Sequence, residues 1–109
     1  MKESGRDILP GDVVLSVRGR DMNRQMLVLE VKDGFVSVCD GRIRRTEKPK
    51  RKKAAHVRWQ ARPQGEGWLG RVSEKIRAGG KVTNSELRRA LNEYSAPDGA
   101  PGRDANVEG

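Results

Sequence analysis

The sequence is short of the residues on which metal, disulfide and most catalytic chemistry depends. Its 109 residues include one cysteine, Cys39, and one histidine, His56. An intrachain disulfide is therefore impossible, and the clusters of cysteine and histidine that hold zinc are absent. A glycine-rich loop with nucleotide-binding spacing is missing as well. We expect a protein that is not an enzyme and that has no catalytic residue, metal or cofactor.

Aromatic residues and long apolar segments are also scarce. The chain has two Trp, one Tyr and one Phe, and 34% of its residues are hydrophobic, which is too little to build a deep ligand pocket beside a core. No apolar run approaches the length of a membrane span, and residues 1–10 lack the apolar stretch and cleavage pattern of a secretory signal. We expect one modest domain in a cytoplasmic monomer that does not associate with membranes.

Positive charge, by contrast, is abundant and concentrated. The net charge is +8, and the segment from Arg42 to Arg58 holds nine Lys or Arg residues against one acid, Glu47. The rest of the chain carries equal numbers of acidic and basic side chains. A basic excess confined to one segment is typical of a polyanion-binding surface, while a solvated charge run with no partner is the alternative interpretation.

The stretch from Gly11 to Val31 has the pattern of two β-strands around a polar, basic loop. Apolar residues alternate with other residues on both sides of this loop, which is the period of a strand with one apolar face. Within the loop, Gly19 and Asn23 are the residues best able to adopt a positive φ. A sharp turn is therefore predicted between the two strands.

Further hairpin signals follow at Asp33-Gly34 and Asp40-Gly41. They predict a third strand over Phe35–Cys39 and a short fourth strand over Arg42–Thr46, with its one isoleucine pointing inward. One more strand near Ala55–Trp59 would complete a small antiparallel barrel.

The segment from Lys48 to Lys53 is expected to be an exposed loop or arm. Pro49 cannot donate a hydrogen bond to a sheet, and the five Lys and Arg residues crowd like charges together.

A family resemblance follows from these patterns. The pair Gly11-Asp12 before an apolar strand, a glycine six to eight residues further on, a basic loop and a second apolar strand resemble the KOW motif of small RNA-binding and ribosomal proteins. The run Glu47–Lys53 strengthens the likeness to KOW proteins related to those of the large ribosomal subunit. The likeness covers residues 11–59 and extends more loosely to Tyr94. The family usually has glycine, often after lysine, where this chain has Met22-Asn23.

The resemblance implies an SH3-like barrel that docks on structured RNA, above all ribosomal RNA, in a ribosome-associated or translation role. Gly19 and Asn23 would shape the loop. The predicted RNA contacts are Arg20, Arg24, Arg42, Arg44, Arg45, Lys48, Lys50, Arg51, Lys52 and Lys53. Patterns of the proteins that read DNA through its major groove are absent, and the aromatics are too dispersed for an RNA-recognition motif. Recognition would therefore depend on the shape and backbone of the RNA.

Two other functions stay open. SH3-like barrels also bind proteins, so the chain is alternatively an interaction module in transcription or translation complexes, with a ribosomal protein or translation factor as partner and with Trp68 or Leu91 as apolar contacts. A nucleic-acid chaperone that binds DNA and RNA alike is the third possibility. Trp59 and Trp68 are interpreted as core residues, with base stacking as the alternative.

The period changes to 3.6 beyond the proline- and glycine-rich linker. Leu69, Val72 and Ile76 share one helical face, which ends at Gly79-Gly80. Residues 83–86, Thr-Asn-Ser-Glu, form a capping box that starts a second helix, with Val82 and Leu87 as its hydrophobic staple, and Leu87, Ala90, Leu91 and Tyr94 as its apolar stripe. This helical hairpin is expected to fold back on the barrel, although docking on a partner is the alternative.

The predicted fold is thus mainly β with a small α appendage. Its parts are a flexible N-terminus (1–9), a KOW-type SH3-like barrel (10–60) with a basic arm (42–53), a linker (61–67), a helical hairpin (68–94) and a disordered tail (95–109).

Overall fold

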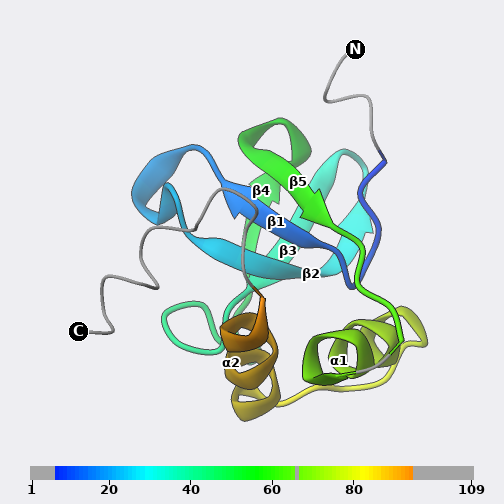
Figure 1. The fold of residues 1–109 in the computed structure, drawn as a ribbon. Helices are drawn as coiled ribbons and strands as arrows, with labels where there is room; N and C mark the ends of the chain where they lie inside the picture. Colours follow the sequence, from blue (N-terminus) through cyan, green and yellow to red (C-terminus); the bar gives the residue numbers. More distant parts are fainter. Residues whose placement is uncertain (1–6, 66, 95–109) are drawn as a thin grey trace.

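Five strands form one antiparallel sheet with two helices on one face (Figure 1). The computed structural model describes residues 7–65 and 67–94, so the predicted disordered tail and most of the predicted flexible N-terminus lie outside it. The elements are β1 (Val13–Ser16), β2 (Gln25–Lys32), β3 (Phe35–Cys39), β4 (Lys50–Lys53), β5 (Val57–Ala61), α1 (Gly67–Arg77) and α2 (Asn84–Glu93), with 3-10 turns at Gly19–Asp21 and Ala54–His56. A mainly β fold with appended helices is confirmed.

The first three predicted strands and their turns are confirmed. β1 pairs with β2 and β2 with β3, both antiparallel. Gly19 and Asn23 have φ of +82° and +70°, which lets the chain reverse between β1 and β2. Asp33 and Gly34, with φ of +52° and +81°, make the tight turn between β2 and β3.

The predicted strand over Arg42–Thr46 is wrong. One carboxylate oxygen of Asp40 accepts the backbone amides of Arg42 and Arg44 at 2.9 and 3.0 Å. The carbonyl of Arg44 in turn accepts the amides of Asp40 and Gly41 at 2.9 and 3.0 Å. These bonds close residues 40–44 into a loop, and Ile43, predicted to point inward, is 59% exposed. Local side-chain bonding by an aspartate has outcompeted a strand ladder.

The predicted exposed arm over Lys48–Lys53 is wrong for its last four residues, because Lys50–Lys53 form the edge strand β4. Pro49 precedes this strand, so its missing donor breaks no ladder bond. Side chains that alternate across the sheet keep the like charges apart, and one of them, Lys52, is buried. The last strand, β5, begins at Val57 rather than near Ala55, since Ala54–His56 form a 3-10 turn.

The strands order as β4-β3-β2-β1-β5, and the described strands form an open sheet with β4 and β5 at its edges. Barrel closure is therefore not observed. Val57 of β5 and Val38 of β3 nevertheless share one buried cluster, with Val14, Met26, Val28 and Val36, so the sheet curls around its own side chains.

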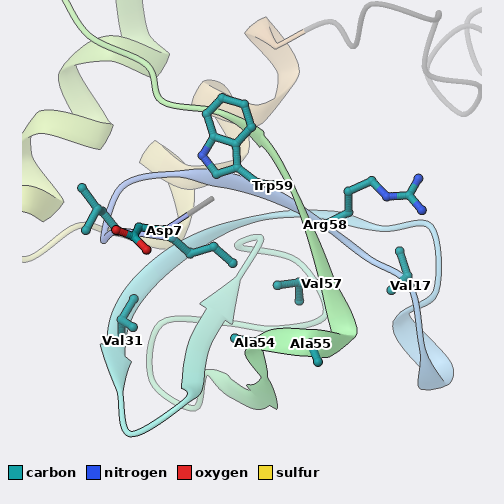
Figure 2. A pocket seen from close by; sticks show the side chains of 10 residues that line it. Asp7, Val17, Val31, Ala54, Ala55, Val57, Arg58 and Trp59 are labelled. Carbon is teal, nitrogen blue, oxygen red and sulfur yellow. The ribbon is translucent and has the colours of Figure 1, made fainter. Parts of the chain in front are cut away.

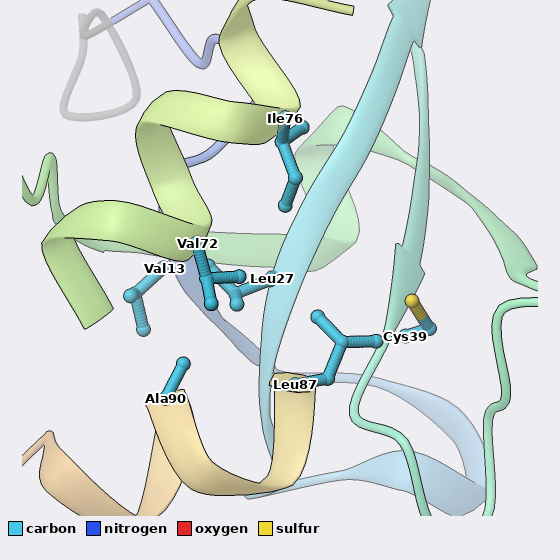
Figure 3. Packing of buried hydrophobic residues seen from close by; sticks show 7 residues of the cluster. All are labelled: Val13, Leu27, Cys39, Val72, Ile76, Leu87 and Ala90. Atoms are coloured by element: carbon cyan, nitrogen blue, oxygen red, sulfur yellow. The ribbon is translucent and has the colours of Figure 1, made fainter. Parts of the chain in front are cut away.

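The opposite face of the sheet packs against the helices, as expected for the hairpin. Val13, Leu27 and Cys39 of the sheet meet Val72 and Ile76 of α1 and Leu87 and Ala90 of α2 (Figure 3). Both faces of β1 are thus buried, which explains why the neighbours Val13 and Val14 are each 0% exposed. The sequence pattern had indicated only one apolar face.

The predicted helix signals are confirmed. Thr83 accepts the Glu86 amide at 3.1 Å through its hydroxyl, and the Glu86 carboxylate accepts the Thr83 amide at 2.9 Å, which completes the capping box of α2. Gly79, with φ of +86°, follows the end of α1. Neither helix in the described part of the chain is long and apolar enough to cross a membrane.

Candidate nucleic-acid interface

Two buried aspartates hold the loop after β1 against the loop after β3. Asp21, in the 3-10 turn, is 3% exposed and accepts bonds from Arg44 Nε at 3.2 and 3.3 Å, with Arg44 Nη2 at 3.1 Å. Asp40, 5% exposed, lies 3.5 Å from Nη1 of Arg24. Each loop therefore supplies an acid to an arginine of the other, and the two loops predicted to bind RNA form one surface.

The strand β4 joins this surface through Lys52. Its Nζ donates a hydrogen bond to the carbonyl oxygen of Arg18 at 3.0 Å, just before the 3-10 turn. Burial of an ammonium group is costly unless the group is paired, so this contact accounts for the inward orientation of Lys52. The first loop, the second loop and β4 are thus contiguous.

Helix α2 supports the loop after β3 through side-chain hydrogen bonds. Arg88 donates to the carbonyl oxygen of Gly41 at 2.8 Å. The Asn84 side chain accepts the Thr46 amide at 2.8 Å and donates to the Glu47 carboxylate at 2.9 Å. That bond from Asn84, followed by a backbone bond, lowers the pKa of Glu47 below its ordinary value. The loop after β3 is therefore anchored to α2 at several points.

The ten predicted RNA contacts comprise three that are engaged inside the protein, six that are exposed and one that is half-buried. Three are engaged inside the protein: Arg24 and Arg44 with aspartates, and Lys52 with a carbonyl. The exposed members are Arg20, Arg42, Arg45, Lys48, Arg51 and Lys53, while Lys50 is half-buried. Among the exposed members, Arg45 pairs with Glu47 at 3.6 Å and Arg51 lies over the ring of Phe35.

Sequence reasoning missed the residues that organise this surface. The sequence predicts a turn at Asp40-Gly41 and a loop that includes Asp21, but it does not predict that each aspartate anchors an arginine of the other loop. Asn84 was assigned only to the helix cap, although its side chain binds the loop after β3. No local signal reports such contacts, because their partners lie 16 to 38 residues away in the chain.

Asp12, from the Gly-Asp pair of the KOW resemblance, anchors the opposite end of the sheet. Its carboxylate is 0% exposed and accepts bonds from the Leu9 amide at 2.9 Å and from Trp59 Nε1 at 3.1 Å. Arg62 completes the site with two bonds of 3.0 Å, and Nη2 of Arg77 lies 3.9 Å away. This group ties the segment before β1 to β5, to the linker and to α1.

Of the two tryptophans interpreted as core residues, Trp68 packs against a core cluster, whereas Trp59 belongs to neither cluster and lines the groove beside β5. Trp59 bonds to Asp12, and Trp68 packs against the cluster beneath the helices, with the Arg89 guanidinium 4.5 Å from its ring. Cys39 is equally internal: burial first, then the charges of Asp40 and Glu47, raises the pKa of its thiol from 9.0 to about 12. Such a thiol is a poor nucleophile at neutral pH.

A groove of about 990 Å³ opens beside β5, away from the helices (Figure 2). Apolar side chains make most of its lining, and Arg58 stands at its edge. The lining includes Ile8, Leu9, Val31, Ala54, Ala55, Val57 and Trp59. Leu9 and Val31 are 42% and 38% exposed, so the groove carries apolar surface that neither cluster covers.

Comparison of the chain with protein-family models finds no match, and comparison with curated proteins finds no relative. In the described residues no group of three or more His, Cys, Asp or Glu side chains gathers as a metal site. The candidate interface is therefore defined by geometry and charge alone.

Proposed function

We propose that this protein binds structured RNA, above all ribosomal RNA, through the surface formed by the loop after β1, the loop after β3 and strand β4. The observation that carries the proposal is the contiguity of these three segments, because together they hold most of the excess positive charge of the chain. The fold proposed with it is an SH3-like barrel of the KOW type. The strand order and the positive φ of Gly19 and Asn23 support that assignment.

Binding would proceed by neutralisation of phosphates. The aspartates and α2 hold the loops in one conformation before binding, so that little ordering entropy is lost on contact. The exposed cations Arg20, Arg42, Lys48 and Lys53 have no acidic partner within 4.0 Å among the described side chains. Each that docks on a phosphate releases counterions and contributes about −0.7 to −0.9 to the slope of log affinity against log salt.

Replacing Lys48 and Lys53 together with glutamine is expected to weaken binding to a folded ribosomal RNA fragment about 25-fold at 0.1 M salt. The estimate follows from about 0.7 log units per phosphate contact at that salt concentration. The salt slope should become shallower by about 1.4 to 1.8. Fluorescence anisotropy between about 0.05 and 0.3 M salt measures both quantities.

The matched control is the Arg71→Gln, Lys81→Gln protein, which loses the same charge from exposed positions on α1 and after it. It should bind the RNA within about twofold of the wild type. An equal loss of RNA affinity in the two double variants would mean that the net charge of the protein, not this surface, determines binding. Equal affinity of the wild type for duplex DNA would favour the chaperone function instead.

The groove beside β5 supports a second candidate, a site for an acidic, extended segment of a partner protein. β5 is an edge strand of the sheet that the described strands form, and apolar side chains of an extended segment laid along it would enter the groove. Charge complementarity favours an acidic partner, since Arg58, which lines the groove, is exposed on a chain of net charge +8. Copies of this basic chain would repel one another.

The second candidate predicts that a nine-residue peptide of alternating glutamate and valine binds, and that Val31→Ser weakens its binding about tenfold. Loss of one apolar contact of this size corresponds to about 1.4 kcal/mol. Met22→Ser is the matched control, because Met22 is 54% exposed outside the groove. Isothermal titration calorimetry measures the affinity of the peptide for the wild type and for both variants. A peptide that does not bind the wild type, or that binds both variants alike, would remove the groove as its site.

A further inference from the structure

Phe35 is a large aromatic side chain that belongs to neither hydrophobic cluster. It lies at the first position of β3, on the same face as Cys39 at the far end of that strand. Cys39 is covered by the helices, whereas Phe35 is half-buried beside the edge strand. Burial in the core thus does not account for the presence of an aromatic ring here.

What Phe35 contacts is the guanidinium of Arg51. The Cζ atom of Arg51 lies 4.3 Å from the centre of the Phe35 ring, within the range of a cation–π contact. The register of β3 and β4 sets Ser37 opposite Arg51 and Lys53 opposite Phe35. A ring, a planar cation and an ammonium group therefore share one open face of the sheet at its edge.

We propose that Arg51 and Phe35 form a stacking site for an unpaired nucleobase, with Lys53 binding the phosphate beside it. An exposed guanidinium that lies over a ring on one side can accept a second planar group on its other side. Bases stack on arginine and on aromatic side chains with little dependence on their identity. The site is an addition to the proposed RNA-binding function and depends on it.

This site would direct the protein to loops, bulges or single strands. The face of a base inside a helix is already covered by its neighbours, so only an unstacked base can reach the guanidinium. The phosphate contacts of the rest of the surface carry no such preference. The structure thereby distinguishes residues that provide affinity from a pair that selects unpaired bases.

The test measures the affinity of the full chain for two oligomers. One is a single-stranded RNA of twelve adenosines, and the other is an abasic ribose-phosphate chain of the same length. Arg51→Lys keeps the charge but loses the planar group. It should weaken binding of the adenosine oligomer about tenfold and that of the abasic chain by less than twofold. Phe35→Leu, which keeps apolar bulk, should weaken adenosine binding in the same selective way. Arg89→Lys is the matched control, because Arg89 is an exposed guanidinium 4.5 Å from the Trp68 ring on α2, outside the candidate interface, and it should leave both affinities within twofold.

Thermal melts of all three variants within about 3 °C of the wild type would establish that the fold is intact. A wild type that binds both oligomers equally, or an Arg51→Lys protein that weakens both alike, would overturn the stacking site and leave phosphate binding in place. Failure of the wild type to bind either oligomer or folded RNA would overturn the proposed function itself.

Discussion

Replacing Asp12 with asparagine is expected to lower the free energy of unfolding by about 3 kcal/mol. The carboxylate is completely buried and accepts four hydrogen bonds, two of them from the Arg62 guanidinium. An amide of the same shape offers one acceptor atom in place of two and no charge, which leaves Arg62 without its partner. Because the carboxylate joins the segment before β1 to β5 and α1, the loss should affect the whole fold rather than one end.

Urea denaturation followed by circular dichroism measures this difference, and the melting temperature should fall by about 15 °C. Asp33→Asn is the matched control: Asp33 is exposed in the turn between β2 and β3, and asparagine accepts its φ of +52°. That variant should change stability by less than about 0.5 kcal/mol. An Asp12→Asn protein as stable as the control would show that the buried contacts of this carboxylate do not hold the fold together.

The local signals of the sequence predicted the strands and helices that make most of the fold. Phe35–Cys39 was predicted at its observed bounds, because valine alternation and flanking Asp-Gly pairs are written within a few residues. The Thr83 capping box likewise involves partners three residues apart. Features that depend on neighbours in sequence were therefore accessible without a structure.

The errors occurred where distant partners decided the outcome. Lys50–Lys53 has poor intrinsic preference for a strand, yet it pairs with β3, and the carbonyl of Arg18 accommodates Lys52, 34 residues from it in the chain. Arg42–Thr46 has the alternation of a strand, yet Asp40 binds its backbone locally and Asn84 of α2 accepts the Thr46 amide from 38 residues away. Tertiary pairing overrode propensity at Lys50–Lys53, whereas local bonding by Asp40 together with a tertiary contact did so at Arg42–Thr46.

The same distinction applies to the candidate interface. The concentration of basic residues was evident from the sequence, but their division into exposed cations and internally paired ones was not. Arg44 and Arg45 are neighbours of the same type, and only the position of the buried Asp21 determines that Arg44 turns inward. A charge count therefore overestimates the number of residues free to contact phosphates.

Because α2 supports the loop after β3, a substitution at Gly41 in that loop should have a large effect. A Cβ at this position would overlap the carbonyl oxygen of Asn84 and crowd Leu87 and Arg88, and the residue has φ of +82°. We expect Gly41→Ala to lower the free energy of unfolding by about 3 kcal/mol, of which about 1 reflects the left-handed backbone and about 2 the overlap with α2. Urea denaturation measures the total change in the free energy of unfolding.

Gly34→Ala separates the two contributions. Gly34 has almost the same φ, +81°, and a Cβ there would meet nothing within 4 Å, so only the backbone cost of about 1 kcal/mol applies. Because the loop must move away from α2 in the Gly41→Ala protein, its cations lose their fixed arrangement, and RNA affinity should fall for Gly41→Ala but not for Gly34→Ala. Equal destabilisation of the two variants would mean that the loop rests loosely on α2, and that the interface is ordered by the aspartates alone.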